Sequence, residues 1–178
     1  MNKQEIRDEL GGKGDFIRID YLNRFLRENP AIDMKRFAYL NLAETYDKIG
    51  MFIEAAKMFN NLAVLSIAFS EKIKNHLREA ELYIKAGEFE RVDEAMKKAM
   101  SEANASERAE IYFSVKWFYK KQADIYESEL KRNNAARIYE KLLIMNLADS
   151  EREEIKEKLI GLYEKLARFD DVKRLRVK

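Results

Sequence analysis

The feature that most constrains this chain is a residue spacing that occurs four times. A small or aliphatic residue is followed by a tyrosine three positions later, and by a second small or aliphatic residue nine positions after the tyrosine. The tyrosines are Tyr46, Tyr83, Tyr126 and Tyr163, separated by 37, 43 and 37 residues. Self-similarity at such a period is typical of stacked helical hairpins, because each hairpin buries one face against the next. The spacing therefore predicts an array of antiparallel helical pairs.

The distribution of helix breakers agrees with an all-α chain. Pro30 is the only proline, and three of the six glycines, Gly11, Gly12 and Gly14, lie close together near the amino end. Elsewhere apolar residues recur at spacings of three and four, which favours helices over strands. We expect helices over residues 2–10, 15–29, 34–49, 51–68, 71–86, 88–103, 107–131, 134–147, 151–167 and 169–176.

Polar residues and glycines suggest where these helices begin and end. A side-chain oxygen at the N-cap satisfies an unpaired backbone amide, and Ser150 with Glu153 has the form of a capping box. Glycine ends a helix in the left-handed conformation at little cost. The expected N-caps are Asp33, Ser70, Ser106 and Ser150, and the expected helix ends are at Gly50, at Gly87 and, in the third hairpin, at Asn133 and Asn134.

The residues around the tyrosines resemble the tetratricopeptide repeat (TPR). The first hairpin has Leu42, Ala43, Tyr46, Gly50, Phe52, Ala55 and Phe59, and the second has Ala80, Tyr83, Gly87, Phe89, Val92 and Met96. The resemblance covers residues 34–176 and implies an α-solenoid: an all-α, right-handed superhelix of four antiparallel hairpins. It implies one domain over residues 1–178, with residues 1–30 as an N-terminal helical segment or a degenerate half repeat.

The chain also departs from the usual repeat. Its 37-residue spacing is longer than that of a regular TPR, and such irregular repeats resemble those of the SNAP vesicle-fusion adaptors. Leu130 replaces the turn glycine of the third hairpin, and Arg176 stands where the last hairpin should present an aromatic residue.

In TPR proteins the first helices of successive hairpins line a concave groove. The resemblance places in this groove Phe37, Leu40, Glu44, Asp47, Lys74, Leu77, Glu81, Ile84, Trp117, Asp124 and Glu127. Five carboxylates with apolar residues between them suit an amphipathic helix or an extended peptide of basic and apolar character. A solvated face with a few packing contacts between hairpins is the alternative.

Two other segments are rich in apolar residues. Residues 62–69 are apolar around nearly the whole circumference of a helix, which predicts burial between hairpins, with a contact to another chain as the alternative. The long helix that starts near Ser106 has more large apolar residues than one stripe holds, so it contacts neighbours on two sides or leaves a patch for a partner. This helix, or the end of the array, supports a competing hypothesis of a structural homodimer.

The sequence gives no sign of catalysis. Cysteine is absent and His76 is the only histidine, so neither a metal site nor a catalytic triad is expected. The stretch Gly11-Gly12-Lys13-Gly14 lacks the preceding strand and the following serine or threonine of a phosphate-binding loop. We therefore predict a non-enzymatic adaptor or scaffold with no catalytic residues, no metal, no cofactor and no small-molecule substrate, which binds a protein or a peptide.

Charge and hydropathy limit the partners and the cellular location that we expect for this adaptor. The 34 basic and 32 acidic residues nearly balance, so nucleic acid and membrane are not the expected partners. The carboxyl end is basic, with Lys173, Arg174, Arg176 and Lys178. Binding of nucleic acid or of a membrane surface by this end is a third hypothesis, although a solvated tail is favoured over it. No apolar run reaches the length of a membrane span, and we expect a cytoplasmic protein. The 37% of charged residues and the scarcity of glutamine are typical of thermophiles.

Overall fold

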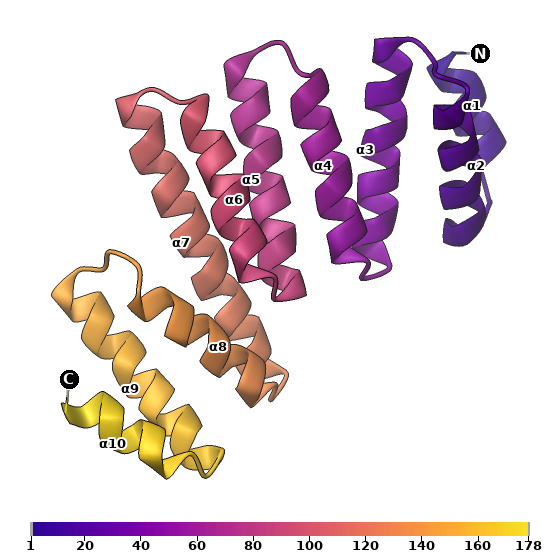
Figure 1. Cartoon of the computed structure of the whole chain (residues 1–178). Helices are drawn as coiled ribbons and strands as arrows, with labels where there is room; N and C mark the ends of the chain where they lie inside the picture. The colour runs from indigo at the N-terminus through magenta and orange to yellow at the C-terminus, as the bar shows by residue number, and fades with distance from the viewer. Residues whose placement is uncertain (1, 178) are drawn as a thin grey trace. The chain divides into compact units, whose positions relative to one another are not determined.

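The computed structural model of this chain describes residues 2–177, and these residues form only α-helices and the loops between them (Figure 1). The ten helices are α1 (Lys3–Leu10), α2 (Asp15–Arg27), α3 (Ile32–Lys48), α4 (Phe52–Leu65), α5 (Phe69–Ala86), α6 (Phe89–Ser101), α7 (Ala105–Ser128), α8 (Arg132–Leu143), α9 (Asp149–Lys165) and α10 (Phe169–Val177). The all-α prediction is confirmed, and each expected helix is present, with ends that differ by a few residues.

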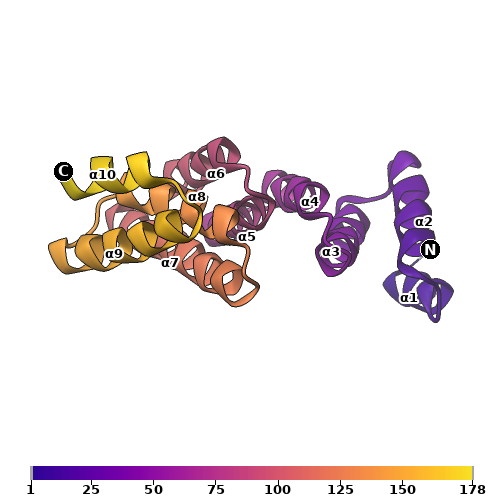
Figure 2. The ribbon, with the colours of Figure 1, turned by 90° about the horizontal axis from the view of Figure 1, so that it is seen from below.

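The helices form two compact units, Met1–Ile111 and Tyr112–Lys178, and α7 begins in the first unit and ends in the second. Packing is sequential in both. In the first unit α2 contacts α3, α3 contacts α4, α4 contacts α5, and α5 contacts α6. In the second unit α9 contacts both α8 and α10. Figures 1 and 2 show α3, α4, α5 and α6 as a row of neighbouring helices whose chain direction alternates.

The repeated residues of the sequence belong to the buried part of the molecule. All four repeat tyrosines are buried, and so are the small residues around them, with Ile160 half-buried as the exception. A small side chain lets two helices approach closely, and the ring of the tyrosine one turn away fills the space beside the contact. The buried small residues are Ala43, Ala55, Ala80, Val92, Ala123, Ala135 and Val172.

Each repeat tyrosine also marks the end of its helix. The backbone C=O groups of Tyr46, Tyr83, Tyr126 and Tyr163 accept hydrogen bonds from the N–H groups five residues later, at 2.8, 3.0, 2.8 and 2.9 Å. Such a bond closes a Schellman motif, which needs a left-handed residue just before the donor. These left-handed residues are Gly50 (φ 78°), Gly87 (φ 74°), Leu130 (φ 57°) and Ala167 (φ 57°).

The positions of these turns can be compared with the helix ends that the sequence predicts. The expectation for Gly50 and Gly87 is confirmed. The expectation for Asn133 and Asn134 is wrong, because the chain turns at Leu130 and both asparagines lie inside α8. The hydrogen bond to the tyrosine carbonyl holds the turn in place even where the left-handed residue carries a side chain.

Leu130 gives a first testable prediction. A left-handed backbone costs a residue with a side chain about 1–2 kcal/mol, and the Leu130 side chain is 73% exposed, so it contributes little packing in return. Leu130→Gly should therefore raise the free energy of unfolding by about 0.5–1 kcal/mol, after the greater entropy of glycine in the unfolded chain is allowed for. Urea unfolding measures this. Leu130→Ala is the control, and an equal gain from alanine would contradict the explanation.

The four N-cap predictions are wrong in the same way, because each predicted residue lies inside its helix and not before it. Asp33, Ser70, Ser106 and Ser150 are each the second residue of a helix. The same polar residue types are favourable in the first turn, near the positive end of the helix dipole, so their presence does not separate the two positions. Helix α7 is capped by Asn104, whose side chain accepts from the Glu107 N–H at 3.0 Å.

The predicted capping box of Ser150 and Glu153 is also wrong. The Glu151 carboxylate accepts the hydrogen bond of the Ala148 N–H at 3.1 Å instead, because α9 begins at Asp149.

The apolar segment 62–69 is only partly buried. Leu62, Ala63 and Ser66 are buried, but Val64, Ile67 and Phe69 are 73%, 92% and 65% exposed. Helix α4 ends at Leu65, and Ser66 has an extended backbone, so the segment does not continue as the single helix whose burial the sequence predicts. That prediction is correct for the three inner residues and wrong for the three outer ones.

The long helix after Ser106 is confirmed as α7, with 24 residues. Within the second unit, Val115 and Tyr119 are buried, whereas Phe113 and Trp117 are 63% and 55% exposed. The helix therefore carries an exposed aromatic patch in addition to its buried side.

A polar network around the buried residues His76 and Glu79 joins three helices of the first unit. His76 and Glu79 on α5 are buried, and the His76 Nδ1 lies 2.8 Å from a Glu79 carboxylate oxygen. The other oxygen of Glu79 accepts from Lys98 Nζ on α6 at 3.0 Å, and this ammonium also donates to Asn60 on α4 at 2.9 Å. His76 is thus a buried residue of this network, in agreement with the packing role that its isolation in the sequence predicts.

Candidate functional site

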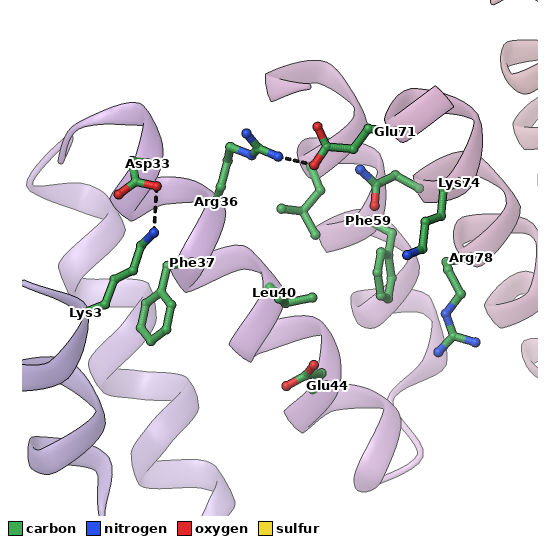
Figure 3. A pocket seen from close by; sticks show the side chains of 12 residues that line it. Lys3, Asp33, Arg36, Phe37, Leu40, Glu44, Phe59, Glu71, Lys74 and Arg78 are labelled. Carbon is green, nitrogen blue, oxygen red and sulfur yellow. Dashed lines mark hydrogen bonds and ion pairs between the residues drawn. The ribbon is translucent and has the colours of Figure 1, made fainter. Parts of the chain in front are cut away.

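The first unit has an open pocket between α3 and α5, with α4 forming its floor (Figure 3). Its volume is about 620 Å³. We call this pocket the groove. It is lined by Lys3, Asp33, Arg36, Phe37, Leu40, Glu44, Phe59, Leu62, Glu71, Lys74, Asn75 and Arg78.

The middle of the groove is apolar. Phe37 and Leu40 come from one face of α3, three residues apart, and Phe59 and Leu62 come from α4 with the same spacing. Residues three apart on a helix share a face, so the two pairs meet in the pocket. Phe37, Phe59 and Leu62 are buried, while Leu40 is 41% exposed. Leu40 therefore leaves apolar surface uncovered at the centre of the groove.

Charged residues surround this centre, and most of them pair with one another. Lys3 Nζ lies 2.7 Å from Asp33, and Arg36 is paired with Glu71 across the groove. Arg78 is paired with Glu81, one turn along α5.

The predicted acidic residue Asp47 is also paired. It lies 2.9 Å from Lys85 Nζ and 3.8 Å from the Arg78 guanidinium. These pairs join α3 to α5, and the positive charge of each cation offsets the negative charge of the carboxylate.

Two groove charges have no ion-pair partner among residues 2–177. They are Glu44 on α3 and Lys74 on α5, both exposed. Figure 3 shows them on the two facing helices, with Leu40 one turn from Glu44 and the Lys74 side chain extending into the groove toward Phe59.

The structure brings together only some of the predicted groove residues of the first unit. Phe37, Leu40, Glu44 and Lys74 line the groove, and Asp47 and Glu81 lie beside it as partners of Arg78. Leu77 packs against the core cluster formed by Ile73, Ala99, Ala103 and Ile111, and Ile84 is buried, with 1% exposure.

Several lining residues were missed in the sequence. Glu71 and Asn75 share the face of α5 that carries Lys74 and Arg78, and their spacing of three residues before Lys74 and Arg78, respectively, was the available signal. Phe59 and Leu62 come from the second helix of a hairpin, where the TPR resemblance assigns packing roles rather than groove positions.

The remaining predicted residues belong to α7 in the second unit. Trp117 is exposed and lies 5.5 Å from the Phe118 ring, centroid to centroid, while Lys121 Nζ lies 4.9 Å from the Trp117 centroid. Asp124 lies 3.7 Å from Lys158 Nζ, and Glu127 accepts a hydrogen bond from the Tyr139 hydroxyl. These two carboxylates therefore have partners within their own unit.

In the second unit, the carboxylate whose pKa is shifted most clearly is that of Glu151. It accepts hydrogen bonds from Lys120 Nζ at 2.7 Å and from Lys116 Nζ at 3.0 Å, in addition to the bond from Ala148. These donors, Lys120 first, lower the pKa of Glu151 from 4.5 to about 2. Because both lysines lie on α7, the cluster ties α9 to α7 and stabilises the ionised carboxylate.

The lowered pKa predicts a pH-dependent contribution to stability. The contribution is fully present above pH 4.5, the ordinary pKa, and is lost as the pH falls toward about 2. Glu151→Gln should lower the free energy of unfolding by about 1 kcal/mol at pH 7, a value limited by solvent screening, and the difference from wild type should shrink between these two pH values. Urea unfolding as a function of pH measures it. Glu153→Gln, on the exposed side of α9, is the control and should show no such trend.

The basic carboxyl end is partly paired as well. Arg174 lies 3.6 Å from Asp171, and Arg176 lies 2.8 Å from Glu164. Lys178 lies outside the described residues. The pairs reduce the free positive charge that a phosphate or an anionic membrane would meet.

Two further observations concern the described residues, and a third concerns the comparison of this chain with known proteins. Within the described residues, no three histidine or acidic side chains gather in an arrangement that could hold a metal ion. None of the helices between residues 2 and 177 combines the length and the apolar character that crossing a membrane requires. No family model, curated protein or solved structure matches this chain.

Proposed function

We propose that this protein is a non-catalytic adaptor that binds a segment of a partner protein, a peptide or a helix, in the groove of its first unit. Within this proposal the chain is a TPR-like right-handed superhelix of helical hairpins. The sequential packing of alternating helices and the tyrosine-centred turn that ends four of them support this assignment. The resemblance then makes the groove between α3 and α5 the natural place for a ligand.

One observation carries the proposal: Leu40 exposes apolar surface in the middle of a pocket whose other apolar residues are buried. Binding sites for protein segments typically combine a small apolar centre with a polar rim. The groove has this composition, since its charged residues surround Phe37, Leu40, Phe59 and Leu62. An apolar side chain from a partner would cover Leu40 and remove that surface from water.

The proposal is tested by affinity capture from the source organism with wild type and two matched variants. Leu40→Asp places a charge at the centre of the groove and should reduce retention of the bound protein at least tenfold, because a buried unpaired carboxylate costs several kcal/mol. Val64→Asp is the control, since Val64 is an exposed apolar residue outside the groove. Equal retention by wild type and Leu40→Asp would refute binding in the groove.

A second candidate function is self-assembly through α7. The observation that favours it is the exposed pair Phe113 and Trp117, one turn apart on the same face of this helix. Exposed aromatic residues of this kind are common at protein interfaces. Light scattering after size exclusion decides between the two, because a strict monomer at micromolar concentrations would remove the dimer, and a dimer that Trp117→Ala dissociates would support it.

A further inference from the structure

We propose that the groove selects a partner segment in which a carboxylate side chain lies next to the apolar anchor, with Lys74 as the residue that receives this carboxylate. The inference rests on the proposed function and specifies the chemistry of the partner. It also reverses the charge that the sequence suggests, since five predicted groove carboxylates favour a basic partner.

The reversal follows from the ion pairs of the first unit. The carboxylates of Asp33, Glu71 and Asp47 each lie against a cation of the same chain, and Glu81 is paired with Arg78. A basic partner would have to compete with these internal cations for the same oxygens. Pairs already formed within the chain therefore contribute little attraction to a ligand.

Lys74 is in the opposite situation. It is the only groove cation that has no acidic partner among residues 2–177, whereas Lys3, Arg36 and Arg78 are each paired. Its side chain extends from α5 into the groove (Figure 3). A partner that covers Leu40 and Phe59 also removes water from this ammonium, which is unfavourable unless an anion replaces the water. Partners without a carboxylate at this point are thus disfavoured, and partners with one gain a charge-assisted hydrogen bond.

Glu44 determines the orientation in which a segment can bind. This unpaired carboxylate lies on α3, one turn beyond Leu40 and on the helix that faces Lys74. It repels an acidic residue on the α3 side of the anchor and tolerates a basic one. The two unpaired charges therefore distinguish a segment with its acid toward α5 from a segment with its acid toward α3, because only the first arrangement brings opposite charges together.

The experiment uses the full chain and a phage-displayed library of random peptides that are long enough to form several helical turns. Selections are run on wild type, on Lys74→Glu and on Lys57→Glu, which makes the same charge change at an exposed position outside the groove. Leu40→Asn, which removes the apolar anchor without adding a charge, serves as the counter-selection target, so that only peptides bound at the groove are kept. Enriched peptides are synthesised, and their affinities are measured by fluorescence anisotropy.

We expect wild type and Lys57→Glu to enrich aspartate or glutamate beside an apolar residue, and Lys74→Glu to weaken these peptides about tenfold and to enrich basic residues instead. Enriched groove-binding peptides without an acidic preference, or with a basic one, would overturn this inference and leave the adaptor function standing. If no peptide distinguishes wild type from Leu40→Asn, the proposed function itself fails, and the two failures are thereby told apart.

Discussion

Replacing Tyr83 with alanine should lower the free energy of unfolding by about 3–5 kcal/mol, which is the range for removing a buried aromatic side chain. Tyr83 is buried, as are the small residues Ala80 and Val92 of the same repeat, and the Arg91 guanidinium lies 5.6 Å from the centre of the Tyr83 ring. Truncation leaves a cavity that these small residues do not fill. The loss is measured by urea unfolding followed by circular dichroism, with wild type in the same buffer.

Tyr83→Phe is the matched control, because it keeps the ring and removes only the hydroxyl. We expect it to cost less than about 1.5 kcal/mol, the net value of one ordinary hydrogen bond. The backbone carbonyl that closes the Schellman turn is present in both variants, so the difference between them isolates the packing of the ring. An alanine variant as stable as the phenylalanine variant would refute the packing role of the repeat tyrosines.

The second large effect concerns the buried network around Glu79. Lys98→Met should destabilise the protein by about 2–3 kcal/mol, because it removes the cation that faces a carboxylate with 2% exposure. Loss of the only partner of a buried charge typically costs about 3–5 kcal/mol, and the remaining contact with His76 reduces that figure here. Chemical unfolding at neutral pH measures the loss.

Glu79→Met gives the control with the opposite expectation. It replaces the buried carboxylate by an apolar side chain of similar length, and its effect should lie within about 1 kcal/mol of zero, because the Lys98 ammonium that it leaves is accessible to water and keeps its hydrogen bond to Asn60, so that no buried charge remains unpaired. The double variant with Lys98→Met should then be nearly as stable as Glu79→Met alone. A large further loss in the double variant would show that Lys98 acts through its own packing and not through Glu79.

Much of the fold could be predicted from the sequence because its determinants are local. The recurrence of alanine and tyrosine at fixed offsets predicts contacts between the two helices of one hairpin. Gly50 and Gly87 directly indicate the left-handed turn. Leucine is not a typical turn residue, and only the register of the repeat, which places Leu130 at the position of the turn glycine, indicates the turn there. Its conformation is imposed by the hydrogen bond from the Lys131 N–H to the Tyr126 carbonyl, 2.8 Å long.

The groove was less predictable because its character depends on contacts between residues far apart in the sequence. Arg36 pairs with Glu71, and Asp47 pairs with Lys85, each across more than thirty residues. A list of charged residues on helix faces counts these carboxylates as available to a ligand, whereas the folded chain has already neutralised them. Only the three-dimensional arrangement separates Glu44 and Lys74 from the rest.

The tyrosine-centred turn has a consequence for how such a chain can vary. Because the turn is closed by atoms within six consecutive residues, starting at the tyrosine carbonyl, it does not depend on how many residues precede the tyrosine in its helix. Helix α7, with 24 residues, ends in the same turn as α3, with 17. Insertions before the tyrosine are therefore absorbed as added helix length, and a hairpin can extend a new surface into solvent without a change in its connection to the next helix.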